Sequence, residues 1–483
     1  MAGKPQFARD DRHDTDDAPL ARVPLRPCAV PVDARSDRFP LAPPSGVPTR
    51  TAAAPSPGWL NRETAREWIR RIGYRIGGLP IVLRAMASRG QTAELRLRRT
   101  YARRYFDIRT PVEALEVVVA AVVAPIVVVL LITVFAARNG AIVARREHRS
   151  IARQVLDQLR LYVGAGVLAP WYYIFELYRQ PTARFAQTFA YRWETKGGVF
   201  HVLRETGLVP TSPLSDKVAF AAFTAACGLP TPRVLAVITP GGIDYRVPAD
   251  DLCADLFVKR VEGRGGNGAQ RWDFRDGLYH SVCGERLSLP ALLERLRQDS
   301  GTAALMIQRR LTNHVSLLSL GNGALSTVRI LTCLDRQEPR IITAAMRMAI
   351  GDNSTVDNLH RGGIAAAVDL ESGKLASASN LGADAALGWV SRHPATGAPI
   401  AGQVLPWWPE TCELAVRAHR HFGDRALVGW DIAITGDGPV IVEGNGSPDL
   451  DIAQRFGHRG LMMGLFTECL AAGVERLRSG RSA

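Results

Sequence analysis

Two short stretches, Val428-Gly-Trp-Asp-Ile432 and Val442-Glu-Gly-Asn-Gly446, decide how the fold of this 483-residue chain is interpreted. The first lies within the β-rich run Leu427 to Ile434 and the second continues the run Pro439 to Val442, so we expect Asp431 on one strand and Glu443 on the next. Side chains two residues apart on a strand face the same way, which places Asn445 beside Glu443. Two carboxylates and an amide oxygen are hard donors that suit Mg²⁺. The alternative is a solvated acidic face, but the apolar surroundings raise the cost of carboxylates that lack a cation.

A second group of residues, upstream of the first, combines lysine with glycine. The chain has only five lysines beside 55 arginines. Lys217 lies at the start of a predicted helix, and Lys259 ends a predicted strand just before Gly263-Arg-Gly-Gly-Asn-Gly268. Backbone amides of such a loop can approach phosphate oxygens, and a lysine ammonium supplies a compact positive charge. The glycines best placed for this are Gly265, Gly266 and Gly268. A glycine loop alone is also typical of a hairpin turn, so the pairing with lysine carries the interpretation.

Three further motifs lie between these groups: Thr327-Val-Arg-Ile330, Met346-Arg-Met348 and Asp357-Asn-Leu-His-Arg-Gly-Gly-Ile364. With all the motifs in this order, the sequence resembles the ATP-grasp family over about residues 205 to 475. More narrowly, it resembles the sugar-transfer-associated branch that is related to the α-L-glutamate ligases. The resemblance implies an α+β ATP-grasp fold, in which two α/β lobes grip ATP.

The resemblance also implies roles for individual residues. The phosphates and adenine of ATP would be bound by Lys217, Lys259, the loop glycines, Gln308 at the hinge between the lobes, and Asn358. Arg329 and Arg347 would stabilise the transferring phosphoryl group. The oxygen donors of Asp431, Glu443 and Asn445 would hold two Mg²⁺ ions, with Mn²⁺ as an alternative.

One position departs from the family pattern. The glutamate ligases place an arginine two residues before the asparagine of this motif, whereas this chain has Val356. Arg347 or Arg361 must then cover that role, and specificity for glutamate cannot be transferred. His360, inside a glycine-flanked loop, is interpreted as structural rather than as a general base. The two carboxylates that follow the metal motif, Asp449 and Asp451, are candidates either for substrate contacts or for helix caps.

The activity implied by the resemblance is ATP-dependent ligation of a carboxylate to an amine through an acyl phosphate. The substrates would be small or sugar-linked molecules in cell-surface polysaccharide metabolism. Two alternatives stay open: a phosphotransferase or thioester-forming enzyme, and an inactive nucleotide-binding scaffold. Residues 151–483 carry 35 basic and 32 acidic residues, which argues against a nucleic-acid partner for this part of the chain.

The N-terminal third differs in composition from the rest. Residues 1–150 carry 25 of the 60 basic residues against 14 acidic ones. Residues 1–58 contain eleven prolines and little apolar periodicity, which predicts a disordered tail. Residues 59–110 follow as a basic amphipathic region, in which apolar side chains recur every four residues among arginines. The mean hydropathy of the whole chain, -0.01, excludes a transporter with many spans.

Membrane attachment is predicted for residues 111–140. Val117 to Ala137 is a run of 21 residues without a charge, long enough to cross a bilayer. Pro125 allows either a kinked span or a re-entrant turn, and the flanking arginines do not specify an orientation. Because ATP is cytosolic, we expect the catalytic domain on the cytoplasmic side of the inner membrane.

The rest of the chain is divided by its pattern. Residues 141–204 are predicted to be a helical connector with one buried helix over Leu161 to Phe175, residues 205–475 the catalytic domain, and 476–483 a tail. Strands are expected at Ala254 to Val261, Ala304 to Gln308, Thr327 to Leu334, Arg340 to Met346, Leu427 to Ile434 and Pro439 to Val442. Helices are expected at Ser215 to Cys227, Leu289 to Leu296 and Pro409 to Phe422.

Overall fold

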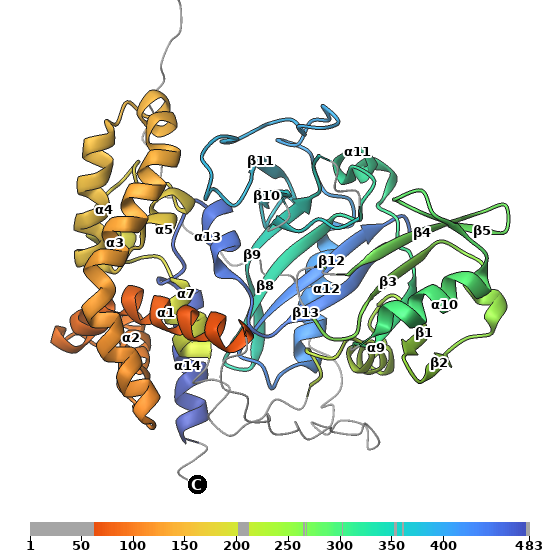
Figure 1. Cartoon of the computed structure of the whole chain (residues 1–483), viewed down its shortest axis with the longest axis horizontal. Coiled ribbons are helices and arrows are strands. Elements are labelled where there is room, and N and C mark those ends of the chain that lie inside the picture. The colour runs from red at the N-terminus through yellow and green to blue at the C-terminus, as the bar shows by residue number, and fades with distance from the viewer. Residues whose placement is uncertain are drawn as a thin grey trace, which may run out of the picture.

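Two antiparallel sheets and a group of N-terminal helices make up the part of the chain that the computed structural model describes (Figure 1). The described residues are 62–200, 212–263, 266, 268–301, 303–351, 355–359 and 362–479. The predicted tail over residues 1–58 lies outside them. The helices lie on one side of the molecule, and the two sheets follow one after the other away from them.

The smaller lobe contains a seven-stranded sheet in the order β2-β1-β7-β3-β4-β5-β6. Its strands are β1 (Val234–Thr239), β2 (Gly242–Tyr245), β3 (Leu256–Arg260), β4 (Gln270–Arg275), β5 (Leu278–Ser281), β6 (Arg286–Leu287) and β7 (Leu305–Arg309). Helix α10 (Leu289–Ser300) buries its leucines against this sheet in a core that includes Leu292, Leu296, Trp272 and Tyr279. The 3-10 turn η2 (Ala249–Leu252) precedes β3, and α9 (Lys217–Ala226) leads into the lobe.

The larger lobe contains a six-stranded sheet in the order β11-β10-β9-β8-β12-β13. Its strands are β8 (Thr327–Asp335), β9 (Glu338–Met348), β10 (Ile364–Val368), β11 (Leu375–Ser379), β12 (Leu427–Thr435) and β13 (Gly438–Asn445). Helix α12 (Trp408–His421) covers one face, where Val328, Ile330, Trp430 and Ile432 are buried. Helices α13 (Leu450–Phe456) and α14 (Leu465–Ser479) cover part of the opposite face. The short elements η3 (Val315–Leu317) and α11 (Leu318–Gly321) connect β7 to β8.

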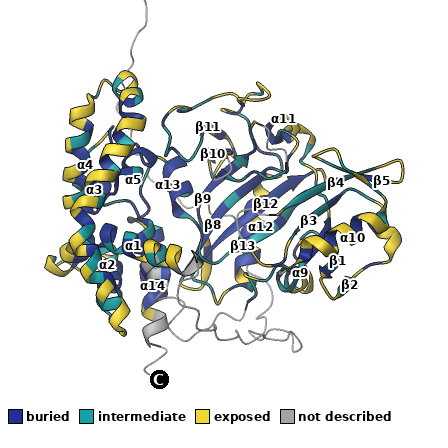
Figure 2. Cartoon of the chain, in the orientation of Figure 1, coloured by how far each residue is buried: buried dark blue, intermediate teal, exposed yellow. Residues whose placement is uncertain are grey.

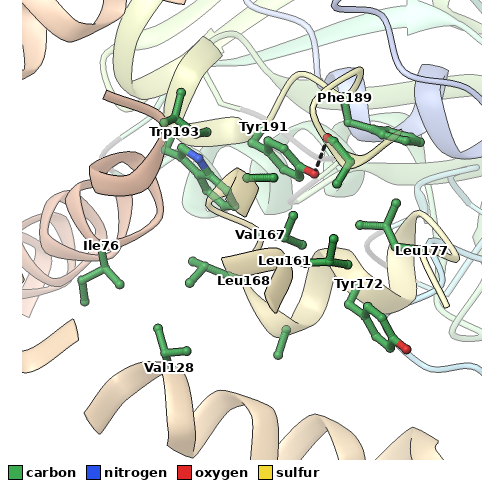
Figure 3. Close-up of a cluster of buried hydrophobic side chains, with 14 of the residues drawn as sticks. Ile76, Val128, Leu161, Val167, Leu168, Tyr172, Leu177, Phe189, Tyr191 and Trp193 are labelled. Carbon is green, nitrogen blue, oxygen red and sulfur yellow. Dashed lines mark hydrogen bonds between the residues drawn. The ribbon is translucent and has the colours of Figure 1, made fainter. Parts of the chain in front are cut away.

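The N-terminal helices form their own core, seen close up in Figure 3. They are α1 (Arg62–Ala87), α2 (Ala93–Tyr105), α3 (Pro111–Arg146), α4 (Ile151–Ala165), α5 (Ala169–Ile174), α6 (Ala183–Ala186), α7 (Arg192–Glu194) and the π-helical turn η1 (Thr195–Val199). Aromatic side chains dominate the centre: Tyr172, Tyr191 and Trp193 are no more than 1% exposed. Because this core is continuous from α1 to α7, the N-terminal region is a folded unit.

The predicted strands and helices of residues 205–475 overlap observed elements in each case. Two predictions in the N-terminal region are wrong. The single helix over Leu161 to Phe175 is split into α4 and α5, because Gly166 takes the left-handed conformation (φ 68°) that ends a helix. The turn at Pro125 is also wrong, since α3 runs unbroken through it. Helix α3 is the one described helix that is long and apolar enough to cross a membrane.

Candidate active site

The strand register brings the three predicted oxygen donors to one face of the larger sheet. Asp431 on β12 lies directly opposite Glu443 on β13, and Asn445 lies opposite Gly429. Directly opposite residues on antiparallel strands point to the same side, so Asp431 and Glu443 share a face. The register shifts by one residue just after this pair, between Asp431 and Ile432. The bulge follows the place where the donors gather, and such irregularities often re-aim side chains beside sites.

Two arginines lie on the same face beside these donors. Arg329 on β8 lies opposite Asp431 and donates from Nε to Asp431 Oδ1 and from Nη2 to Oδ2, the latter at 3.0 Å. Arg347 on β9 places Nη2 3.1 Å from Asp431 Oδ2 and 3.2 Å from Asp357 Oδ1. We call these four residues, Arg329, Arg347, Asp357 and Asp431, the sheet cluster. It joins the two arginines predicted to be catalytic to one of the predicted metal ligands.

The charge state of the sheet cluster follows from its burial. Burial alone would raise the pKa of Asp431, but the guanidinium groups of Arg329 and Arg347 outweigh it and hold the pKa below its usual value. Asp357 differs: burial raises its pKa despite the nearby Arg347. Thr327 donates to Asp357 Oδ2 from its backbone N at 2.8 Å and from Oγ1 at 2.6 Å. Asp431 is therefore an ionised carboxylate that two cations hold in place.

The two predicted phosphate-binding lysines lie beside this sheet: Lys259 on β3 of the smaller lobe, and Lys217 on α9, whose Phe220 packs in the core of the larger lobe. Lys217 begins α9, which Asp216 caps, and its Nζ donates to the carbonyl oxygen of Gly263 at 2.9 Å. Lys259 lies on β3. Burial lowers the pKa of Lys259 from 10.5 to about 8, with Lys217 adding to the effect and the carboxylate of Glu443 opposing it. An ammonium with this pKa is poorly solvated, so an anionic ligand would bind it favourably.

A small cavity, partly open to solvent, lies where these elements meet. Its lining combines both lysines and Glu443 with apolar side chains: Leu214, Lys217, Phe220, Ala221, Thr231, Pro232, Lys259, Gln308, Ile441, Val442 and Glu443. Gln308 on β7 donates from Nε2 to the carbonyl oxygen of Pro232 at 3.0 Å. The cavity thus combines apolar side chains with two cationic groups and one carboxylate.

The glycine loop reaches toward the larger sheet. Gly266 and Gly268 have φ of 69° and 73°, a conformation that favours glycine. A Cβ on Gly266 would lie 3.1 Å from Val356 Cγ1, so the loop approaches the segment that carries Asp357 and Asn358. Gly265, His360 and Arg361 lie outside the described residues. The structure therefore brings the loop and the Asp357 segment together, as phosphate binding would require.

The donor chemistry of the site fits divalent metal ions. Asp431, Glu443 and Asn445 offer two carboxylates and an amide oxygen, the ligand types that Mg²⁺ prefers. Within the described part of the chain, no group of three or more His, Cys, Asp and Glu side chains could hold a metal by itself. A metal bound here would therefore rely on Asn445 and on oxygens from phosphates or water, as Mg²⁺ commonly does in nucleotide sites.

Asp449 and Asp451 lie in a second group of charges outside the lining of this cavity, although Asp449 and Arg329 line a second, smaller pocket together. Arg192 pairs with both carboxylates, at 2.7 Å from Asp451 Oδ2, and Lys196 Nζ lies 3.5 Å from Asp449 Oδ2. Asp449 also caps α13 by accepting from the backbone N of Asp451. We call Arg192, Lys196, Asp449 and Asp451 the junction cluster, because it joins α7 and η1 to α13. Of the two roles considered for these carboxylates, the cap is present at Asp449.

Three residues of these clusters, Asp357, Arg192 and Lys196, have no role predicted from the sequence. Asp357 is the first residue of the motif that ends at Ile364. Its buried contact with Arg347 depends on strand pairing, which the residues next to it in the sequence do not indicate. Arg192 is one of 55 arginines, and its partners lie more than 250 positions away. The aspartates after the metal motif were the only signal of the junction cluster.

Comparison with known proteins identifies the family of this chain. A profile described as "Sugar-transfer associated ATP-grasp" matches residues 210–466, more than half of the chain. No curated protein matches the sequence.

Solved structures give distant similarities. A D-alanyl-alanine synthetase A from Vibrio cholerae matches with a TM-score of 0.32 and 12% identity, over 55% of this chain and 65% of its own length. A D-alanine–D-alanine ligase from Bacillus anthracis gives 0.33 and 12%, over 55% and 69%. A RimK domain ATP-grasp protein from Sphaerobacter thermophilus gives 0.29 and 13%, over 53% and 67%. The profile match, which covers both lobes, places this chain in the sugar-transfer associated ATP-grasp family.

Proposed function

We propose that this protein is an ATP- and Mg²⁺-dependent ligase that joins a carboxylate to an amine through an acyl phosphate. One observation carries the proposal: Lys217, Lys259, Gln308 and Glu443 line a single cavity between the lobes. Lysines suited to phosphates, a polar group beside an apolar wall and a carboxylate suited to a metal are what binding of a nucleotide with its metal requires.

The residues of the chain would act mainly by neutralising charge. Lys217 and Lys259 would bind the phosphates, and the loop with Gly266 and Gly268 would cover them. Arg329 would stabilise the negative charge of the phosphoryl group as it moves to the substrate carboxylate. Mg²⁺, when bound by Asp431, Glu443 and Asn445, would supply further positive charge between the phosphate oxygens. The amine then displaces phosphate from the acyl phosphate, which forms the amide.

Asp431 has a further part in this proposal. Its carboxylate is shared between Arg329 and Arg347, so the arginines are held on the sheet face before any ligand binds. Preorganised charges need no reorientation during the reaction and stabilise a transition state more effectively. This chain has Val356 at the position where the glutamate ligases have an arginine. Arg347 is the described residue best placed to assist Arg329 instead.

The substrates are assigned by class. The family description points to sugar-linked metabolism, and we propose acceptors that belong to cell-surface polysaccharide synthesis. Helix α3 supports a location at the inner membrane, with the catalytic lobes on the cytoplasmic side where ATP is available.

The test uses purified full-length protein, Mg²⁺, ATP and a small-molecule cell extract. Mass spectrometry should find a new compound whose mass equals two metabolites minus one water, formed together with ADP and phosphate. A parallel reaction with Glu443→Gln should not form it. A product heavier than one metabolite by a phosphoryl group would show a phosphotransferase instead. Absence of ATP turnover with every extract fraction would support the scaffold.

A further inference from the structure

The ligase chemistry leaves the outward side of α3 without a role (Figure 2). Eight large aliphatic side chains on this helix are each between 44% and 69% exposed. They are Val112, Leu115, Val118, Val122, Ile126, Val129, Leu130 and Val134, and we call them the α3 apolar face. Soluble monomers rarely expose a continuous apolar patch of this extent, so it marks an interaction surface.

The opposite side of α3 is part of the protein core. Ala120, Ala124, Val128, Ile132 and Ala136 recur every four residues and are at most 5% exposed. They pack against α1, α4 and α5, as Val128 does in Figure 3. Because the buried stripe continues along most of the helix, only one side of α3 is available to lipid.

Polar contacts tie both ends of α3 to the same folded body. Near its start, Glu116 is 1% exposed and lies 2.9 Å from Arg71 Nη2 and 3.5 Å from Arg75 Nε, both on α1. Near its end, Arg138 pairs with Asp384 at 2.8 Å. There Asn139 also accepts from the backbone N of Ala385 at 2.9 Å.

These contacts are incompatible with a helix that crosses a bilayer. The helix rises about 33 Å between Glu116 and Arg138, close to the thickness of a hydrocarbon core of about 30 Å. A crossing helix would place α1 and the loop with Asp384 on opposite sides of the membrane. The larger lobe carries that loop and packs against α2 through α14, so the two sides cannot be separated without unfolding the interface.

We propose that the α3 apolar face lies in the plane of one leaflet of an anionic phospholipid membrane, and that α3 does not cross the bilayer. The composition of the face favours lipid over protein. Its large exposed side chains are valine, leucine and isoleucine, without the aromatic residues, methionine and arginine that dominate protein interfaces. Exposed arginines at the C-terminal end of α3 and on α4 complement lipid phosphates: Arg145, Arg153 and Arg160.

In-plane attachment has a consequence for the catalytic lobes. Both ends of α3 remain on one side, so the N-terminal helices and both sheets are held together at the membrane surface. The cavity with Lys217 and Lys259 would then meet substrates that are themselves confined to that surface. The inference depends only on α3 and its contacts, so it can fail without affecting the proposed ligase activity.

Flotation with vesicles tests the lipid contact. Full-length protein should float with vesicles of phosphatidylglycerol and phosphatidylcholine, and less with phosphatidylcholine alone. The double variant Val122→Glu with Ile126→Glu should lose at least tenfold of this binding at an unchanged thermal midpoint, because charges on an embedded face are costly. The matched control is Val282→Glu with Val315→Glu. These two valines are also exposed, but they lie in the smaller lobe and in η3, which connects the two lobes. This variant should bind as the unmodified chain does.

Three results would overturn the lipid contact. One is full-length protein that stays soluble and does not float with anionic vesicles. Another is a stable dimer in detergent-free buffer that the same double variant dissociates, which would assign the face to a second copy of the chain. The third is equal loss of flotation in the control variant.

Labelling in bacterial spheroplasts separates in-plane attachment from a span. Single cysteines are introduced by Arg109→Cys or Arg145→Cys, at either end of the apolar run, in a chain whose Cys28, Cys253 and Cys283 are serine. A membrane-impermeant maleimide should label neither position until the cells are lysed, and then both. Labelling of one end in intact spheroplasts would show a span and overturn the proposal.

Discussion

Two buried groups of charges in this protein are built from the same residue types and differ in their surroundings. The sheet cluster lies on one face of a single sheet, next to Glu443 and the cavity with both lysines. The junction cluster lies between two structural units and is completed by Trp171, whose Nε1 donates to Asp451 Oδ1 at 3.2 Å. The two clusters differ in position rather than in composition: the first adjoins the cavity with both lysines, and the second joins the N-terminal helices to α13, with Asp449 lining a pocket that Arg329 also lines.

The comparison also indicates what each cluster should do when it is altered. Desolvation makes buried ion pairs poor contributors to stability, so retained pairs need another reason. For the sheet cluster we propose charge stabilisation during phosphoryl transfer. For the junction cluster we propose orientation of the N-terminal helices against α13. Changes around the first should affect turnover at nearly constant stability, and changes in the second should affect stability first.

The largest effect is expected from Glu443→Gln. Glutamine is nearly isosteric with glutamate but lacks the charge that a divalent metal requires, so ATP turnover should fall by about a hundredfold or more. The free energy of unfolding should change little, because the side chain lines the cavity and is only half-buried. Turnover is measured as ADP release and stability by urea unfolding. Turnover at the unmodified rate would remove Glu443 from the site.

Arg192→Ala should have the next largest effect, and on stability. The carboxylates of Asp449 and Asp451 would lose their shared arginine, which should lower the free energy of unfolding by roughly 2 kcal/mol. Burial and the charge of Asp449 raise the pKa of Asp451 to about 6, so the loss should be smaller at pH 5, where Asp451 is mostly protonated, than at pH 8. Urea unfolding at both pH values measures the difference.

Arg295→Ala is the matched control for this variant. Arg295 also pairs with two carboxylates, those of Glu285 and Asp299, but on the exposed surface of α10. Exposed pairs contribute little, so the free energy of unfolding should change far less than in Arg192→Ala at either pH. Equal decreases in the free energy of unfolding for the two variants would show that the junction cluster stabilises the fold no more than an exposed ion pair does.

The catalytic lobes were more predictable from sequence than the N-terminal unit. The runs Thr327 to Leu334 and Leu427 to Ile434 are rich in apolar and β-branched residues, so local composition alone predicted β8 and β12. Asp431 and Glu443 followed because the strand pair is short and consecutive. The same reasoning failed for α5, whose break from α4 depends on one left-handed glycine, Gly166.

The other features that could not be predicted from the sequence depend on contacts between residues far apart in the chain. The 21 uncharged residues of α3 predicted a membrane segment, but whether one side is covered depends on α1, α4 and α5 packing against Ala124 and its neighbours. Small side chains in an apolar run are compatible both with lipid and with close helix packing. Arg192 likewise gives no local signal of its distant partners.

Lys259→Arg should reduce turnover by at least about tenfold, which corresponds to about 1.4 kcal/mol of barrier. A planar guanidinium needs more room and other angles than a compact ammonium among closely spaced phosphate oxygens. Lys374→Arg is the control, because Lys374 is exposed beside a turn and away from the cavity. Steady-state ADP release measures both variants. Equal activities would mean that Lys259 does not contact the phosphates.

The last effect is a gradual one, the pH dependence of nucleotide binding, which sharpens the contrast between Lys259 and the arginines of the sheet cluster. Burial lowers the pKa of Lys259 from 10.5 to about 8 without ligand, and bound phosphates should raise it again. Between these values the unfolded chain holds more protons than the folded one, so stability should rise with pH from 8 to 10.5. Binding of ADP over the same window should take up a proton and weaken by at most about tenfold per pH unit.

Calorimetry at pH 9 in two buffers of different ionisation enthalpy measures the uptake of this proton. In Lys259→Arg the uptake should vanish, because a guanidinium stays charged throughout this range. Uptake that persists in that variant would assign the titrating group to another residue.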